Sequence, residues 1–297
     1  MVNPELEHTD WEWEEVETVL CDLCGGNSHR RVVEENGFWM VRCRDCGLVF
    51  CNPRPTPDEM TRFYADYFQP ESEDLWEEQM RRPFQKEGVD FLNSVMKPDR
   101  VLDVGCAHGF FLRMMRETGW ECVGVEPSPD AARYASEKLN LEVHSGHVED
   151  APFARGSFGA ATLWYVLEHV PNPTAVLSHA ARLLRPGGYL ILRVPNANVK
   201  VDRMLALLGN FGRRFFLINP PRHLYDYNTS TIRKLLRKTG FKVLKMQNAI
   251  PRSAGGFLER FRRHAWFWKA ELERFLTRGQ KLTGSSITVY ARKRKQS

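Results

Sequence analysis

The sequence predicts an α/β protein with a doubly wound, mostly parallel sheet, preceded by a small zinc ribbon. Three observations lead to this fold class. From about residue 77, helical segments alternate with continuous apolar strands, the pattern of a parallel sheet covered on both faces. A strand, a glycine turn, a helix and a second strand follow one another over residues 101–126. Two C-x2-C pairs stand before this region.

The two cysteine pairs belong to an amino-terminal module that we place at residues 1–68, together with a proline-rich connector. They form the pattern C-x2-C-x18-C-x2-C through Cys21, Cys24, Cys43 and Cys46. A glycine follows each pair, which eases the tight turn of a metal-binding knuckle. Four thiolates leave no open coordination position, so we expect one structural zinc ion. Two disulfides or free thiols are the alternative, which the lack of a secretory signal disfavours.

The segments between and after the cysteines complete the module. HRRVVEE and FWMVRC, residues 29–35 and 38–43, predict a hairpin of two short strands. Three prolines within residues 53–57 favour extended backbone. Thr56 or Asp58 is a suitable cap for a helix near residues 58–66. The polar residues 69–76 then predict a linker to a second domain at residues 77–297.

Within the second domain we expect helices and strands in alternation. The helices are predicted at residues 76–95, 110–117, 129–138, 174–184 and 229–239. The strands are predicted at residues 100–105, 122–126, 141–145, 161–166, 189–195, 241–247 and 286–293. The last strand follows another strand, so we expect it to run antiparallel to its neighbours.

The glycine turn carries the first functional signal. A dinucleotide site has the spacing G-x-G-x-x-G. Here Gly105 and Gly109 are separated by Cys-Ala-His, so the middle glycine is missing and the turn alone does not identify a cofactor. Glu126, at the end of the next strand, is placed to accept two ribose hydroxyls. A helix-capping or surface role is the alternative for this residue.

Five segments in order resemble the class I S-adenosylmethionine-dependent methyltransferases. They are the residues from Asp103 to Gly109, Glu126, the loop EDAPF with its following SF, WYVLEHVPNP at 164–173, and LLRPGGYLILRVPN at 183–196. The resemblance covers about residues 85–247 and 286–293 and implies a Rossmann-like, seven-stranded sheet. The first 68 residues resemble the zinc-ribbon front end of some bacterial small-molecule methyltransferases of this class.

The resemblance also implies which residues bind S-adenosylmethionine. The methionine end would lie on the glycine turn, at Asp103, Gly105, Cys106, Ala107 and Gly109. Glu126 and Pro127 would hold the ribose. The family's usual Gly-Asp is Gly146-His147 here, so the Val148 backbone, Glu149 or Asp150 would serve the adenine instead. Trp164, at the end of the fourth strand, would face the crevice.

Candidate catalytic residues follow the fourth strand and precede the last helix. His169 matches a histidine that commonly lines the acceptor site in this family. It can act as a general base, since histidine titrates near neutral pH. The alternative is that it only forms a hydrogen bond with the backbone. The segment PPRHLYDY, residues 220–227, adds His223 and Tyr225, which could shape the acceptor site or be structural.

Two insertions interrupt the family pattern. Residues 197–219 are apolar enough for a lid over the acceptor and equally for a packed helix. Residues 248–285 contain an apolar stripe at helical spacing. Packing of this stripe onto the domain or another subunit is the simpler interpretation. A membrane-surface helix or contact with an anionic substrate is the alternative.

Charge and composition bound the remaining possibilities. Residues 1–20 hold seven acidic and no basic residues, whereas residues 251–297 hold twelve basic and three acidic residues. Such a basic tail can be solvated or can contact nucleic acid or anionic lipid. No apolar run reaches the roughly 18–20 residues that span a bilayer. The acidic start lacks the apolar segment of a secretory signal, so we expect a cytoplasmic location.

We therefore expect a methyltransferase that uses S-adenosylmethionine to methylate oxygen or carbon of a small molecule in a biosynthetic pathway. An RNA methyltransferase is the first alternative, although LEHVPNP stands where base methylation would need an Asn-Pro-Pro-Tyr-type motif. A non-enzymatic protein that binds partners through zinc and basic surfaces is the second. A nicotinamide-dependent reductase is a third, more distant alternative. The sequence does not indicate the acceptor or the number of subunits.

Overall fold

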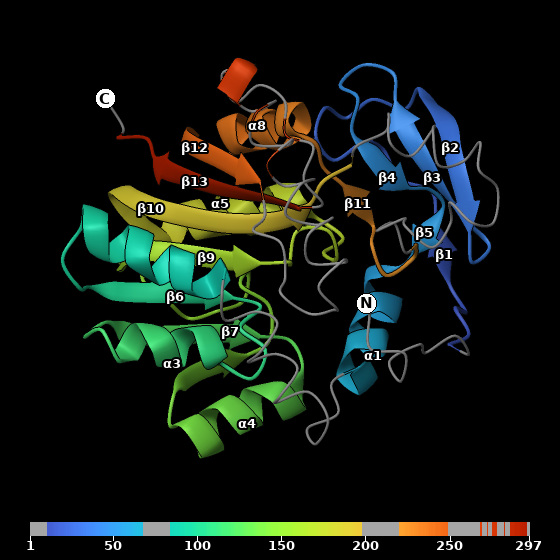
Figure 1. Ribbon diagram of the computed structural model, residues 1–297. Coiled ribbons are helices and arrows are strands. Elements are labelled where there is room, and N and C mark those ends of the chain that lie inside the picture. The colour runs from blue at the N-terminus through green and yellow to red at the C-terminus, as the bar shows by residue number, and fades with distance from the viewer. Residues whose placement is uncertain are drawn as a thin grey trace, which may run out of the picture.

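The computed structural model describes residues 11–67, 84–197, 220–248 and 286–295, with residues 268, 272, 275–277 and 282. Its centre is a seven-stranded sheet in the order β12-β13-β10-β9-β6-β7-β8 (Figure 1). The strands are β6 (Arg100–Val104), β7 (Glu121–Glu126), β8 (Glu142–Ser145), β9 (Phe158–Trp164), β10 (Leu184–Pro195), β12 (Phe241–Asn248) and β13 (Ser286–Lys293). Strands β6 to β10 pair in parallel, and β13 is antiparallel to both of its neighbours. The predicted fold class and the antiparallel last strand are confirmed.

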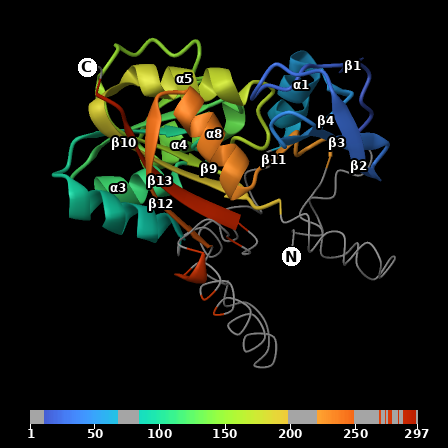
Figure 2. The same cartoon turned by 90° about the horizontal axis from the view of Figure 1, so that it is seen from above.

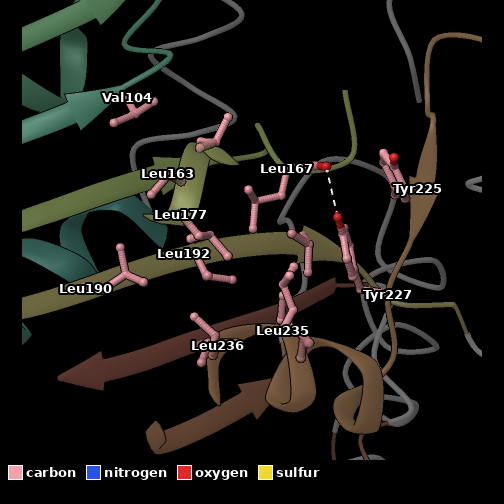
Figure 3. Close-up of a cluster of buried hydrophobic side chains, with 14 of the residues drawn as sticks. Val104, Leu163, Leu167, Leu177, Leu190, Leu192, Tyr225, Tyr227, Leu235 and Leu236 are labelled. Atoms are coloured by element: carbon pink, nitrogen blue, oxygen red, sulfur yellow. Dashed lines mark hydrogen bonds between the residues drawn. The ribbon is translucent and has the colours of Figure 1, made fainter. Parts of the chain in front are cut away.

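Helices cover both faces of this sheet. They are residues 84–95, α3 (Phe110–Arg116), α4 (Pro129–Leu139), α5 (Pro173–Leu183) and α8 (Thr229–Lys238). Because successive strand residues point to opposite faces, Leu190 and Leu192 of β10 pack with α5 and α8, as Figure 3 shows. Ile191 between them joins the cluster on the other face, with Phe84 and Phe111. Both faces of the central strands are therefore buried, as in a doubly wound fold.

One strand is longer than the sequence suggested. We expected RPGG, residues 185–188, to be a loop before a strand at 189–195. The structure starts β10 at Leu184, which pairs with Phe158 of β9, and the register then shifts before Tyr189. The glycines thus form an irregularity inside the strand instead of a separate turn. Periodicity could not reveal this pairing, because it depends on the position of β9.

The amino-terminal module is built around a second, four-stranded sheet in the order β11-β4-β3-β2. Its strands are β2 (His29–Glu35), β3 (Phe38–Cys43), β4 (Val49–Cys51) and β11 (Tyr225–Asp226), beside the pair β1 (Val16–Glu17) and β5 (Arg54–Pro55). The predicted hairpin of β2 and β3 is confirmed. Helix α1 (Pro57–Tyr67) follows β5, and the Thr56 hydroxyl accepts the Glu59 amide as its cap. The module lies beside the carboxyl ends of the parallel strands (Figures 1 and 2).

Strand β11 joins the module to the second domain. Tyr225 pairs with Phe50 of β4 although the two residues are far apart in sequence. The Asp22 carboxylate accepts the backbone amide of Thr174 at the start of α5. Lys238 of α8 donates to the carbonyl of Asp22 at 2.7 Å. The module is therefore bound at several points to the domain that follows it.

The predicted lid over residues 198–219 lies outside the described residues, as does most of the insertion at 248–285. No helix among the described residues is long and apolar enough to cross a bilayer.

Candidate functional site

The glycine turn between β6 and α3 has the backbone that close approach to a ligand requires. Gly105, Ala107 and Gly109 all have positive φ, of 70°, 47° and 81°. A Cβ at Gly105 would lie 2.6 Å from the Val166 side chain, and one at Gly109 would lie 2.5 Å from Leu141. Glycine is therefore required at both positions for backbone conformation and for space.

Glu126 lies at the tip of β7, directly beside this turn. Its side chain is 3% exposed. One carboxylate oxygen accepts the Ala107 amide at 2.8 Å, and the other accepts the Ser128 amide at 2.8 Å. These bonds hold the carboxylate between the glycine turn and the start of α4. A carboxylate accepts about four hydrogen bonds, so Glu126 is suited to receive the two hydroxyls of a ribose as well.

The other residues predicted at the cofactor differ in their burial. Asp103 is 2% exposed, and its carboxylate accepts the Thr162 hydroxyl of β9 at 2.6 Å. Cys106 is buried below the turn, and Pro127 is half-buried at the start of α4. Glu149 is half-buried and Asp150 exposed in the loop after β8, which makes Glu149 the more sheltered candidate for the adenine.

Trp164 does not lie as the sequence suggested. We expected it to face the crevice at the end of β9. Its indole is instead 3% exposed and packs against Phe84 and Phe111, with ring centroids 5.7 and 5.2 Å away. The strand alternation turns this side chain toward the helices on one face of the sheet, so it supports the site from within the core.

A second group of polar side chains lies beyond the end of β9. The rings of His169 and His223 are 4.9 Å apart between centroids. Glu168 is fully buried, and one of its oxygens lies 3.9 Å from Nε2 of His169. The structure therefore brings together the two histidines that the sequence proposed separately, and adds a buried carboxylate beside them.

The surroundings of His169 determine which of its nitrogens carries the proton. Nδ1 lies 2.9 Å from the carbonyl oxygen of Arg222, which can only accept a hydrogen bond. Nδ1 therefore donates, and in the neutral ring Nε2 has the lone pair. The Tyr64 oxygen lies 2.7 Å from the same Nδ1, and the Tyr64 hydroxyl donates to the Arg222 carbonyl at 3.4 Å. This is the tautomer that a general base needs if it acts through Nε2.

Tyr225 has a different place from the one expected at an acceptor site. It is 1% exposed, and its hydroxyl lies 2.8 Å from Arg54 and donates to the carbonyl of Pro171 at 2.9 Å. Burial raises the pKa of this phenol well above its usual range. These contacts favour a role in holding the module to the domain. The prediction of Tyr225 as a catalytic residue is therefore corrected, and we describe it as a packing residue.

The four cysteines lie together as a zinc site requires. The sulfurs of Cys21 and Cys46 are 3.5 Å apart, as are those of Cys24 and Cys43. Zinc–sulfur bonds of about 2.3 Å place tetrahedral sulfurs about 3.8 Å apart, so the cluster has the size of a tetrathiolate site. Burial raises the pKa of Cys46 to about 11 and that of Cys21 further. Ionised thiolates here therefore need a compensating cation.

Among the described residues, two groups of side chains could hold a metal ion: these four cysteines, and Glu168 with His169 and His223. Sequence reasoning found the first group from its spacing. It missed the contribution of Tyr64, which belongs to the amino-terminal module and carries no motif signal for a contact with His169.

The chain matches a known family over most of the second domain. The family described as a methyltransferase domain matches residues 76–246, which is more than half of the chain. The ubiquinone biosynthesis O-methyltransferase of Xanthomonas oryzae pv. oryzae (strain PXO99A) is 38% identical over 103 residues, covering 33% of this chain and 43% of that protein. The enzyme of the same name from Aromatoleum aromaticum is 29% identical over 164 residues, covering 52% of this chain and 68% of that protein. The chain thus spans less than half the length of the first of these relatives.

Solved structures share the fold at low identity. A chain from the complex between the Haloferax volcanii Trm112 methyltransferase activator and a putative methyltransferase aligns with a TM-score of 0.56 and 17% identity, covering 81% of this chain and 98% of that chain. A methyltransferase from Archaeoglobus fulgidus, described as SAM dependent, aligns with a TM-score of 0.50 and 16% identity, covering 75% of this chain and 100% of that chain. At this identity the likeness supports the fold alone.

Proposed function

Because the chain belongs to the methyltransferase-domain family, we propose that it transfers a methyl group from S-adenosylmethionine to an oxygen of a small phenolic molecule. The observation that carries this proposal is the Glu126 carboxylate, held by two amides beside a glycine turn that tolerates no side chain at its ends. Oxygen as the methylated atom is supported by the relatives, which are named for O-methylation in ubiquinone biosynthesis. We infer an amino-terminal module at residues 1–68 and a catalytic domain from residue 77.

The residues on the donor side of the site bind and orient S-adenosylmethionine. Gly105, Ala107 and Gly109 let backbone approach the methionine portion, and Glu126 receives the ribose hydroxyls. A fixed carboxylate at this position would repel a 2′-phosphate, which disfavours a phosphorylated nicotinamide cofactor. S-adenosylmethionine, when bound, supplies an electrophilic methyl group with its own leaving group, so the protein has to align the acceptor and exclude water.

On the acceptor side, a phenol has to lose its proton as its oxygen is methylated. The Nε2 lone pair of His169 is the acceptor for that proton in our proposal. The buried carboxylate of Glu168, 3.9 Å from Nε2, would stabilise the imidazolium that results. His223, whose ring faces His169, would bound the acceptor pocket on the other side.

Replacing His169 with Gln tests this assignment. We expect turnover of 3,4-dihydroxybenzoate, used as a catechol probe, to fall by about 10²-fold, within the range that general base catalysis contributes. S-adenosylmethionine affinity by calorimetry should stay unchanged, since His169 follows β9 and the donor lies on β6 and β7. The control is His179→Gln on α5. A His169→Gln enzyme with unaltered turnover at saturating probe would exclude the base.

The structure describes a few residues of the insertion at 248–285, and these are relevant to the membrane-surface helix that the sequence offered as an alternative. Trp268, Leu272, Phe275 and Leu276 are helical residues and are 68%, 58%, 76% and 70% exposed. Packing onto the domain or another subunit was the simpler expectation for this stripe. The exposure of these four side chains disfavours packing onto the domain of the same chain and leaves another subunit as the alternative to a membrane surface. Residues 251–285 contain eight basic and three acidic residues, which complements an anionic surface.

We therefore expect the protein to float with phosphatidylglycerol liposomes and not with phosphatidylcholine liposomes. Phe275→Glu should abolish flotation, because a charge in the apolar stripe opposes insertion. Glu142→Gln, on the distant strand β8, is the control. Equal recovery with both lipids, or none with either, would contradict membrane contact. A cytoplasmic location stays a prediction, and RNA stays the less favoured alternative partner.

A further inference from the structure

We propose that Tyr64 is a positioning residue for His169, so that the amino-terminal module forms part of the acceptor site. This inference rests on the proposed function, because it assigns Tyr64 to the side chain that we propose as the base. The contact joins residues 105 positions apart, from helix α1 and from the loop after β9. Nothing in the family match, which begins at residue 76, includes Tyr64.

The geometry of the contact is specific. The Tyr64 oxygen lies 2.7 Å from Nδ1 of His169, and the rings meet edge to face with centroids 5.7 Å apart. The Arg222 carbonyl lies within hydrogen-bond distance of both side chains, at 2.9 and 3.4 Å. Tyr64 thus bonds the nitrogen that must keep its proton, and its ring limits rotation of the imidazole. Loss of the hydroxyl alone would remove the bond and retain the ring.

The neighbours of Tyr64 on helix α1 hold the helix, and with it Tyr64, at this position. Phe63 is 1% exposed and packs against Trp11 and Trp13, at 5.4 and 5.1 Å between ring centroids. Arg62 forms ion pairs with Glu14 and with Glu59 of the same helix. Aromatic burial of this extent fixes the rotation of the helix about its axis. The orientation of Tyr64 is therefore set by the module itself.

The same module also binds the backbone that carries the two histidines. The Cys51 amide of β4 donates to the Leu224 carbonyl at 2.8 Å, and the Leu224 amide donates to the Glu168 carbonyl at 2.7 Å. A continuous chain of backbone hydrogen bonds thus runs from the module's sheet to the residue before His169. His223 is directly before Leu224. Both sides of the Tyr64–His169 contact are consequently held by the amino-terminal module, so the hydroxyl keeps its place against Nδ1.

The test is the Nδ1–H resonance of His169 in the Tyr64→Phe variant, compared with wild-type and with Tyr189→Phe as the matched control. Histidine labelled with ¹⁵N reports the proton on each nitrogen, and the His169→Gln variant assigns the signal. We expect wild-type and Tyr189→Phe to show one tautomer with the proton on Nδ1. Tyr64→Phe should keep the proton on Nδ1, because the Arg222 carbonyl still accepts it, but should shift the Nδ1–H resonance because one of its two partners is lost. Turnover of 3,4-dihydroxybenzoate should fall about tenfold, the effect of one hydrogen bond, with KM little changed.

An unchanged His169 signal in Tyr64→Phe would overturn the inference. So would a fall in turnover accompanied by loss of bound zinc or of helical circular dichroism, because that result indicates a folding defect. The His169 resonance can be measured with neither cofactor nor acceptor. Failure of the wild-type protein to bind S-adenosylmethionine would therefore refute the proposed function and leave the result on Tyr64 intact.

Discussion

Replacing Glu126 with Gln is expected to weaken S-adenosylmethionine binding by about 10²-fold. The variant exchanges a charged acceptor for a neutral amide, and each hydrogen bond to a charged group contributes about 1.5–3 kcal/mol. In the folded protein the carboxylate also accepts the amides of Ala107 and Ser128, so the glycine turn loses part of its support. Titration calorimetry with S-adenosylmethionine and with S-adenosylhomocysteine measures the effect.

Glu121→Gln is the matched control for this prediction. Glu121 begins the strand that Glu126 ends, and it is exposed. Its replacement should leave the affinity within about twofold, because surface substitutions away from special features change stability little. Equal affinities for wild-type and Glu126→Gln would show that this carboxylate does not bind the ribose. The support for a nucleoside cofactor at this edge of the sheet would then be lost.

Replacing Cys43 with Ser is expected to abolish stoichiometric zinc and to unfold the amino-terminal module. We propose one zinc ion per chain, held by all four cysteines. Apparent binding free energies of structural zinc are about 10–16 kcal/mol, and a module of this size has too small a core to fold without it. Plasma emission spectroscopy measures the metal, and proteolysis of residues 1–68 measures the unfolding. The proteolysed module should release Tyr64 from His169, so turnover should fall with the zinc content.

Cys51→Ala is the control, since Cys51 is a buried cysteine of the same module, in β4, whose thiol donates to the carbonyl of Pro53 and which is not one of the four clustered cysteines. Its replacement removes packing contacts of a buried side chain, but the variant should retain one zinc per chain. S-adenosylmethionine affinity should survive in both variants if the domain stays folded, because the donor side lies on β6 and β7. A wild-type protein purified without chelator and free of zinc would contradict the tetrathiolate site.

The glycine turn and the position of Glu126 were accessible from the sequence for a physical reason. The glycine turn and Glu126 occupy one continuous strand–turn–helix–strand unit, so local backbone preference and apolar periodicity place them together. The four clustered cysteines likewise come in two local pairs whose spacing reports the knuckle geometry. The order of helices and strands was predictable because each element buries a recognisable face.

The acceptor side depended on contacts that no local pattern encodes. Trp164 is one residue at a strand end, and only the packing of α3 and residues 84–95 showed which face it takes. Tyr225 was read as an acceptor contact because it lies near His223 in sequence. The structure pairs it with β4 and shows it buried beside Arg54.

The sequence by itself determined the seven-stranded α/β fold, the glycine turn with its carboxylate, and the four-cysteine cluster, because all three follow from short-range periodicity and spacing. Only the tertiary structure decided that the amino-terminal module shares a strand with the second domain and brings Tyr64 to His169. These contacts depend on the shape and hydrogen bonding of two surfaces whose residues lie more than 100 positions apart in the sequence. The surfaces become neighbours only after both parts have folded.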